Sequence, residues 1–134
     1  MPNTTSYKFG DIVLVPFPFA DLTSTKQRPA VVVSGNDYNA EAVVVSENEH
    51  HDLIIVMGVT SVEGALGAAD LKHWRQAGLR YPSAFKPIIT TLAPSRVVRR
   101  LGKLSDEDRN RLKHLLVKVL NLVPSSASPA PPPS

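Results

Sequence analysis

Arg28-Pro29-Ala30-Val31-Val32-Val33-Ser34 is the stretch of this sequence that decides the fold. Its consecutive valines predict a β-strand that is buried on both faces or lies at the centre of a small barrel, because β-branched side chains pack well on a pleated surface. Pro29 fixes its own φ angle and favours an extended backbone at Arg28. A guanidinium held in this way is a good phosphate ligand, since its planar fork can donate two parallel hydrogen bonds. The alternative is that Arg28 is a solvated charge flanking the strand.

Other short apolar runs, separated by turn residues, predict further strands. The expected strands are Ile12 to Val15, Leu53 to Val59, Ile88 to Leu92 and Val97 to Leu101. Residues 38–46 are ambiguous between helix and strand, and residues 47–52 are expected to form a surface loop. Strands do not alternate with helices, so the sequence predicts a mainly β fold, a small barrel or curled sheet, and disfavours a nucleotide-binding α/β fold.

One helix is expected near the C-terminus. Ser105 is a good N-cap, and the acidic residues that follow it suit the positive end of the helix dipole. An apolar stripe at helical spacing could dock on the sheet or on a partner: Leu112, Leu115, Leu116, Val119, Leu120 and Val123. The expected organisation is a flexible tail at 1–8, a single domain at 9–123 and a disordered, proline-rich tail at 124–134.

The composition excludes several kinds of site. The chain has 134 residues, enough for one domain, and a formal charge of +3, a mild basic bias that is compatible with nucleic acid. It has no cysteine, which excludes disulfides, thiolate metal ligands and cysteine nucleophiles. No apolar run reaches the roughly 20 residues of a membrane helix, and the first residues are polar. We therefore expect a cytoplasmic protein without membrane contact.

Few motifs in the chain carry chemistry. No glycine-rich phosphate loop is present, and the cluster His50-His51-Asp52 predicts no metal site, because neighbours on an extended chain point in opposite directions. The remaining candidates are residues at strand ends: Arg28, Thr60, Ser61, Ser83 and Lys86. Such a group suits RNA cleavage without a metal, since the 2′-hydroxyl of the RNA is the nucleophile. Arg28 could stabilise the growing phosphate charge, and Thr60 could position a phosphate oxygen or relay a proton.

Several stretches, in this order and spacing, resemble the MazF/PemK family of toxins from type II toxin–antitoxin systems. They are Gly10 to Val15, the polar loop that leads into Arg28 to Ser34, the segment Val59-Thr60-Ser61, and Gly102 to Ser105 before an acidic helix start. The resemblance spans residues 7–122. It implies a small SH3-like curled β-barrel with a C-terminal α-helix, usually assembled as a homodimer.

The resemblance also implies a sequence-selective endoribonuclease that cleaves single-stranded mRNA without a metal or other cofactor. Arg28 and Thr60 match the family's catalytic positions, and family members leave a 2′,3′-cyclic phosphate and a 5′-hydroxyl. The implied RNA-binding residues are Phe19, Lys26, Ser61, Ser83 and Lys86. The implied partners are a cognate antitoxin, which would cover the groove with a flexible segment, and operator DNA bound through the antitoxin complex.

Two features depart from the family pattern, and two other functions stay open. Gly58-Val59 precedes Thr60 where many members have a proline nearby, and residues 47–52 and the proline-rich tail look like additions. One alternative is a non-catalytic module on the same barrel that binds RNA, DNA or an antitoxin. The other is a gyrase-poisoning toxin; it is disfavoured because those toxins are thought to act through a C-terminal tip with tryptophan, whereas this chain ends in a Pro/Ser tail.

Overall fold

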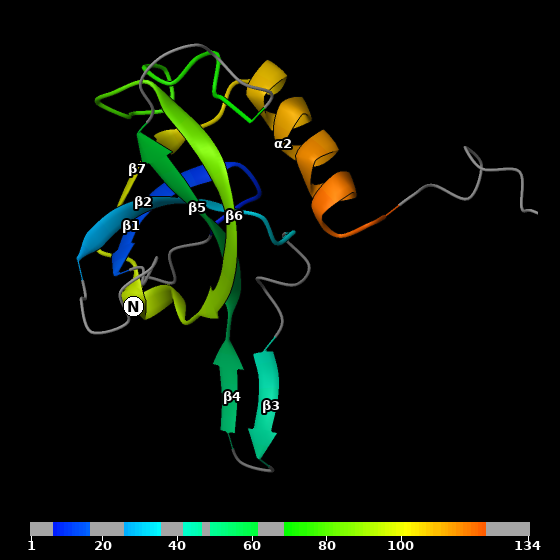
Figure 1. The fold of residues 1–134 in the computed structure, drawn as a ribbon. Helices are drawn as coiled ribbons and strands as arrows, with labels where there is room; N and C mark the ends of the chain where they lie inside the picture. Colours follow the sequence, from blue (N-terminus) through cyan, green and yellow to red (C-terminus); the bar gives the residue numbers. More distant parts are fainter. Residues whose placement is uncertain (1–6, 17–25, 36–41, 47–48, 62–68, 123–134) are drawn as a thin grey trace, which may run out of the picture.

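A computed structural model describes residues 7–16, 26–35, 42–46, 49–61 and 69–122 of the chain (Figure 1). The strands are β1 (Asp11–Pro16), β2 (Gln27–Val32), β3 (Ala42–Ser46), β4 (Glu49–Asp52), β5 (Ile54–Ser61), β6 (Ser83–Leu92) and β7 (Arg99–Lys103). A 3-10 turn, η1 (Pro94–Arg96), precedes β7, and helix α2 (Asp106–Val119) follows it. None of the described helices is long and apolar enough to cross a membrane.

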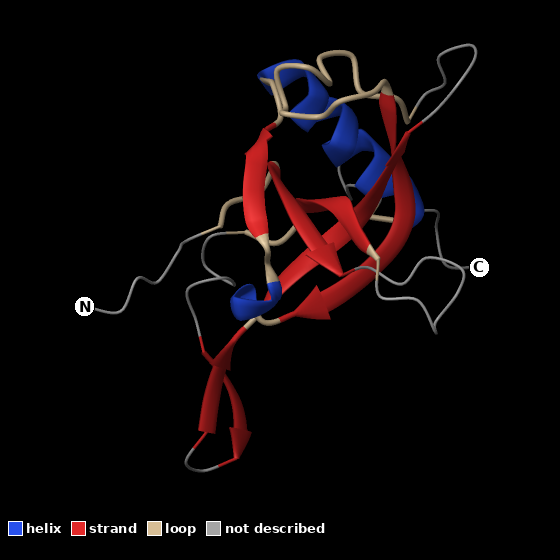
Figure 2. Ribbon diagram, turned by 90° about the vertical axis from the view of Figure 1, so that its left-hand side faces the viewer, coloured by secondary structure: helices blue, strands red, loops and turns tan. Residues whose placement is uncertain are grey.

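Five strands form one antiparallel sheet in the order β6-β5-β2-β1-β7. The sheet curls strongly, and α2 packs beside it, while its edge strands β6 and β7 do not pair with each other (Figure 1). The predicted mainly β fold with a C-terminal helix is therefore confirmed, as a curled sheet that stays open. Strands β3 and β4 form a separate hairpin that extends away from this sheet (Figure 2).

Two expectations for strands were wrong. The surface loop expected at residues 47–52 contains β4, which pairs with β3 and resolves the ambiguous stretch before it in favour of strand at 42–46. The sequence of β4, Glu49-His50-His51-Asp52, is polar throughout, so no apolar pattern revealed it as a strand. β6 begins at Ser83 instead of Ile88. It includes Pro87, which is tolerated because β6 is an edge strand and its register with β5 shifts at that point.

The core has two parts because the central strands bury both faces. Alternate residues of β1 and β2 enter different clusters: Ile12 and Val31 belong to one, Val13 and Val32 to the other, as the valine run predicted. Helix α2 covers the first cluster through Leu112, which is fully buried. The members of the first cluster are Ile12, Val31, Met57, Val59, Leu71, Ala77, Leu79, Phe85, Leu104 and Leu112. Those of the second are Tyr7, Val13, Val15, Ala30, Val32, Ile54 and Val56.

The burial of residues near the two ends of the domain could not be read from the sequence. Tyr7 is buried, so packing begins inside the stretch expected to be a tail at 1–8. The apolar stripe of α2 is buried only in its first half, since Val119 and Leu120 are 39% and 49% exposed. Val123 lies outside the described residues. The exposed half of the stripe is therefore available to a partner.

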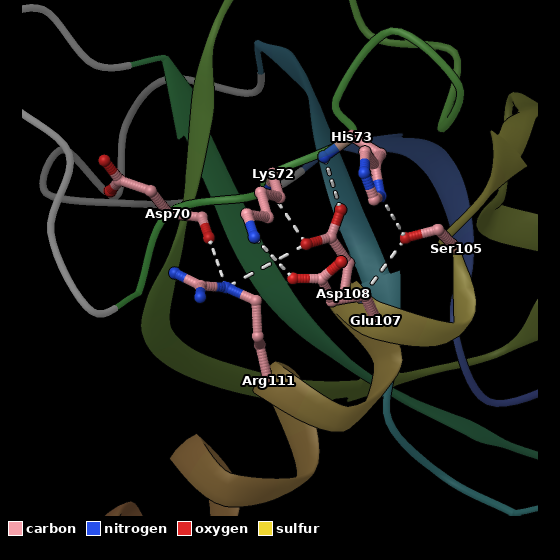
Figure 3. Close-up of polar contacts among 7 residues, drawn as sticks. All are labelled: Asp70, Lys72, His73, Ser105, Glu107, Asp108 and Arg111. Carbon is pink, nitrogen blue, oxygen red and sulfur yellow. Dashed lines mark hydrogen bonds and ion pairs between the residues drawn. The ribbon is translucent and has the colours of Figure 1, made fainter.

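The N-terminus of α2 is bound to the segment before it by a buried carboxylate. Ser105 is the N-cap, as predicted, and its hydroxyl accepts a hydrogen bond from the backbone N–H of Asp108 (3.2 Å). The fully buried Asp108 accepts hydrogen bonds from the backbone N–H of Lys72 (2.8 Å) and of His73 (2.7 Å), one on each oxygen (Figure 3). The ring Nδ1 of His73 lies 2.8 Å from Ser105 Oγ. The backbone of residues 72–73 and the N-cap of α2 are thus joined in one hydrogen-bond network.

Side-chain contacts at the surface extend this junction. The Lys72 ammonium lies 2.8 Å from Glu107 Oε2, and this hydrogen bond holds the pKa of the Glu107 carboxyl below its ordinary value. Arg111 donates from Nε to the backbone oxygen of Asp70 (3.0 Å) (Figure 3). We call the contacts of Asp108, Lys72, His73, Glu107 and Arg111 the helix clamp. It fixes residues 70–73 on the first turns of α2.

The chain after the helix clamp rests directly on β7. Gly78 has φ +90°, and a Cβ there would lie 2.1 Å from the backbone oxygen of Leu101. A Cβ on Gly102 would lie 2.3 Å from the backbone oxygen of Ala77. The two backbones can approach this closely only because both positions are glycine. Residues 79–81 are consequently held beside β7.

Gly78→Ala tests this contact. We expect it to lower the free energy of unfolding by about 2–4 kcal/mol, because alanine strains the positive φ and its Cβ overlaps the Leu101 carbonyl. Gly35→Ala is the control, since nothing lies within 4 Å of a Cβ built there. Urea unfolding of both variants measures the difference, and equal stability would mean that the close approach is absent.

Asp108→Asn tests the helix clamp. The amide can accept only one of the two hydrogen bonds, so a buried N–H loses its partner and we expect a loss of about 1–3 kcal/mol. Asp106→Asn removes the same charge from the same turn, but the Asp106 side chain is fully exposed, and we expect a change below about 0.5 kcal/mol. Thermal or urea unfolding at neutral pH compares the two variants. Equal losses of stability in the two variants would mean that Asp108 acts only through its negative charge at the N-terminus of the helix dipole.

Candidate active site

A cleft of about 690 Å³ opens where β1, β2, β5 and β7 meet the segment that leads from the helix clamp to β6. It therefore combines the rim of the sheet with the chain that the two glycines hold against β7. Its lining residues are Leu14, Gln27, Arg28, Pro29, Val59, Thr60, Ser61, Gly78, Leu79, Arg80, Tyr81, Ser83, Arg99, Arg100 and Leu101.

The register of the sheet brings Arg28 and Thr60 together. The pairing of β2 with β5 ends at Ala30 and Gly58, and Arg28 and Thr60 each lie two residues beyond that pair, at the same end of the two strands. Both of these residues line the cleft. On its other side Arg28 pairs with Val15 of β1, so its extended backbone is fixed by the sheet.

The Thr60 hydroxyl is only weakly engaged. Its nearest acceptor is the backbone oxygen of Ser61, at 3.5 Å, and the contact is exposed to solvent. A hydrogen bond of this length is easily exchanged for one to a ligand. The hydroxyl can therefore reorient toward a group bound in the cleft.

The cleft is strongly cationic. Among the residues that the structure describes, four arginines line it (Arg28, Arg80, Arg99 and Arg100), and no described lining residue is an aspartate, a glutamate or a histidine. Arg100 is held in place by Asp11, at 3.1 Å, and its guanidinium lies 5.0 Å from the Tyr7 ring centroid. Such an array of cations fits a polyanion such as nucleic acid.

The predicted site residues are only partly brought together. Arg28, Thr60, Ser61 and Ser83 line the cleft, whereas Lys26 and Lys86 do not. Phe19 lies outside the described residues. An RNA contact by these last three residues stays a prediction.

Sequence reasoning missed four lining residues: Arg80, Tyr81, Arg99 and Arg100. Arg99 and Arg100 are adjacent in the sequence, near the end of the last expected strand. Their place in the cleft, however, follows from the pairing of β7 with β1 and from the contact between Gly78 and Leu101, which no local pattern encodes.

Within the part of the chain that the structure describes, no group of three or more His, Asp or Glu side chains is placed to hold a metal ion. The candidate cluster His50-His51-Asp52 lies on β4, whose side chains are outside that part.

Comparison with known families matches residues 8–120 to a model described as PemK-like, MazF-like toxin of type II toxin–antitoxin system. Two solved structures from mycobacterial species have a similar fold. One is an endoribonuclease in complex with its cognate antitoxin, with a TM-score of 0.61, 15% identity, and coverage of 88% of this chain and 96% of that chain. The other is an endoribonuclease with a TM-score of 0.60, 16% identity, and coverage of 90% and 96%. A comparison with curated proteins finds no match.

Proposed function

The chain belongs to the PemK-like, MazF-like family of toxins from type II toxin–antitoxin systems, and we propose that it is an endoribonuclease that cleaves single-stranded RNA in the arginine-lined cleft. One observation carries the proposal. Arg28 and Thr60, which match the family's catalytic positions, line the same cleft, and Arg80, Arg99 and Arg100 line it with them. The two mycobacterial endoribonucleases of similar fold support this proposal.

The proposed reaction is an attack of the RNA on itself. The 2′-oxygen forms a bond to the adjacent phosphorus while the bond from phosphorus to the 5′-oxygen breaks. The 2′-hydroxyl gives up its proton, and the leaving 5′-oxygen takes one. The products are a 2′,3′-cyclic phosphate and a 5′-hydroxyl, so no water is consumed.

Arg28 is the proposed electrostatic catalyst. Its guanidinium donates two hydrogen bonds to the non-bridging oxygens, where negative charge grows in the transition state. The remaining arginines of the cleft hold the neighbouring phosphates. Because positive charge comes from side chains, the proposed reaction proceeds without a metal.

Thr60 has a more limited proposed role. Its hydroxyl pKa is too high for an efficient unaided base, so it positions a phosphate oxygen or relays a proton. Among the lining residues that the structure describes, no histidine or carboxylate is placed to take a proton directly. The proposed rate enhancement is accordingly modest. Selectivity for an RNA sequence depends on contacts beyond Arg28 and Thr60.

The proposed partners follow from family membership. An antitoxin segment that fills the cleft would block the RNA, and one structural neighbour is in complex with its cognate antitoxin. Operator DNA would be bound through that complex. A homodimer is proposed as well, with the exposed end of α2 (Val119, Leu120 and Leu122) as an apolar contact surface.

A non-catalytic binding module is the second candidate. The observation that favours it is that the described part of the cleft lining contains no histidine or carboxylate. Such a module would bind single-stranded RNA or antitoxin and leave the RNA intact.

Substitutions of Arg28 and Thr60 test the nuclease. We expect Arg28→Ala to lower the single-turnover cleavage rate about 100- to 1,000-fold, and Arg28→Lys to recover only part of it because lysine lacks the fork. Thr60→Ala should lower the rate about 10- to 100-fold, and Thr60→Ser should restore most of it. The assay uses purified, antitoxin-free protein with EDTA present.

Arg75→Ala is the matched control. It removes the same charge from an exposed arginine that stacks on Trp74, 5.0 Å from the ring centroid, outside the cleft lining. We expect wild-type cleavage from this variant. If the wild-type protein cuts no RNA across diverse sequences, the nuclease is ruled out, and retained RNA binding would favour the binding module.

The homodimer is tested by light scattering. We expect twice the mass of the chain at micromolar concentration, and a shift toward monomer for Leu120→Asp, since a charge would enter an apolar contact. A strictly monomeric wild-type protein contradicts the dimer.

A further inference from the structure

Tyr81 is an exposed aromatic side chain in the wall of the arginine-lined cleft. It is 64% exposed, the highest fraction among the large hydrophobic side chains that the structure describes as exposed. Its neighbour Arg80 also lines the cleft, and Arg99 and Arg100 line the same space from β7. A single exposed apolar residue is ordinary on a protein surface. An aromatic ring in a cleft that four arginines of the described chain also line is a more specific combination.

The backbone of Tyr81 is held firmly. Pro82 follows it and restricts Tyr81 to extended conformations. The Ser83 hydroxyl donates a hydrogen bond to the backbone oxygen of Tyr81 (2.7 Å), and Ser83 itself is only 4% exposed. Ser83 is in turn paired with Ser61 at the end of the β5–β6 ladder. The ring is therefore presented from a fixed backbone, and only its two χ angles remain to be ordered.

On the basis of the proposed function, we propose that Tyr81 stacks on one unpaired base of the RNA, in the same cleft in which Arg28 holds the scissile phosphate. Proteins that bind single-stranded nucleic acid combine cations along the backbone with aromatic side chains against the bases, and one such stack contributes about 1–3 kcal/mol. A base within a duplex cannot present its face in this way. The stack therefore discriminates against double-stranded RNA.

Ser83 receives a different role from the one its sequence implied. Its hydroxyl hydrogen is already donated to Tyr81, so the side chain has no donor left for a phosphate. Ser83 acts as a positioning residue for Tyr81. Ser83 therefore affects RNA binding only through the position of the Tyr81 ring.

Binding to a non-cleavable RNA tests the stack. The probe is a single-stranded oligonucleotide that the wild type cleaves, with a 2′-O-methyl group at the attacking position, followed by fluorescence anisotropy. We expect Tyr81→Ala to weaken binding roughly 5- to 150-fold and Tyr81→Phe to stay within about twofold, since the ring is kept. Binding of duplex RNA should be unchanged in both variants.

Removal of single bases locates the partner of the ring. We expect one abasic position at which the wild type loses affinity while Tyr81→Ala loses no more, because the stack is already gone. A fluorescent 2-aminopurine at that position should be quenched by the wild type and not by Tyr81→Ala. Unchanged affinity of Tyr81→Ala, or additive losses at every position, would overturn the proposal.

Ser83→Ala tests the positioning role. In the wild-type background we expect weaker RNA binding and less quenching, and in the Tyr81→Ala background no further loss. Additive losses would mean that Ser83 contacts the RNA itself.

The stacking proposal and the nuclease proposal can be ruled out independently of each other. If the wild type cleaves no RNA, the same variants are measured on a uridine decamer. If Tyr81→Ala strongly weakens binding to the decamer, the stacking site is supported although the nuclease is ruled out. If the wild type cleaves RNA but Tyr81→Ala binds it with unchanged affinity, the stacking site is ruled out and the nuclease is supported.

Discussion

The buried carboxylate of Asp108 is the contact on which the rest of the site depends. It accepts one backbone N–H on each oxygen, from Lys72 and His73, while its own N–H is capped by Ser105. A buried charge is tolerated only when it is well hydrogen-bonded, so helix and segment must stay together. Through this contact the helix, which does not itself line the cleft, fixes the chain that forms one of its walls.

The other wall comes from the sheet. The glycine contacts between Gly78 and Leu101 and between Gly102 and Ala77 seat the segment against β7. Pairing of β7 with β1, and of β2 with β5, then sets the arginines of the edge strand beside Arg28 and Thr60. Two structural constraints thus converge on one cationic cleft. Their proposed consequence is a surface that holds a single RNA strand by its phosphates and, at Tyr81, by a base.

Local signals in the sequence were sufficient for part of this structure. The valine run predicted a strand buried on both faces, and the hydroxyl of Ser105 with the acidic residues after it predicted the start of α2. The strand and the helix start are each encoded within a few residues. The proposed role of Arg28, in contrast, came from the order of the family motifs around it and not from its local sequence alone.

Features that depend on contacts between residues far apart in the chain could not be predicted from the sequence. Asp108 looked like one of three acids in a helix turn, and its two backbone donors lie 35 and 36 residues away. Arg80 and Tyr81 enter the cleft only because Gly78 rests on β7. The β4 strand was mistaken for a loop because its sequence is polar throughout.

The most direct test of the central claim, self-cleavage of RNA held by arginines, uses one chemical change in the substrate. Wild-type protein in EDTA is given an RNA that it cuts and the same RNA with a 2′-deoxynucleotide at the attacking position. We predict that the modified RNA binds with unchanged affinity and is not cut, while the unmodified RNA yields a 2′,3′-cyclic phosphate and a 5′-hydroxyl. Cleavage of the deoxy-substituted RNA at that position would contradict the claim, because another nucleophile would then be responsible.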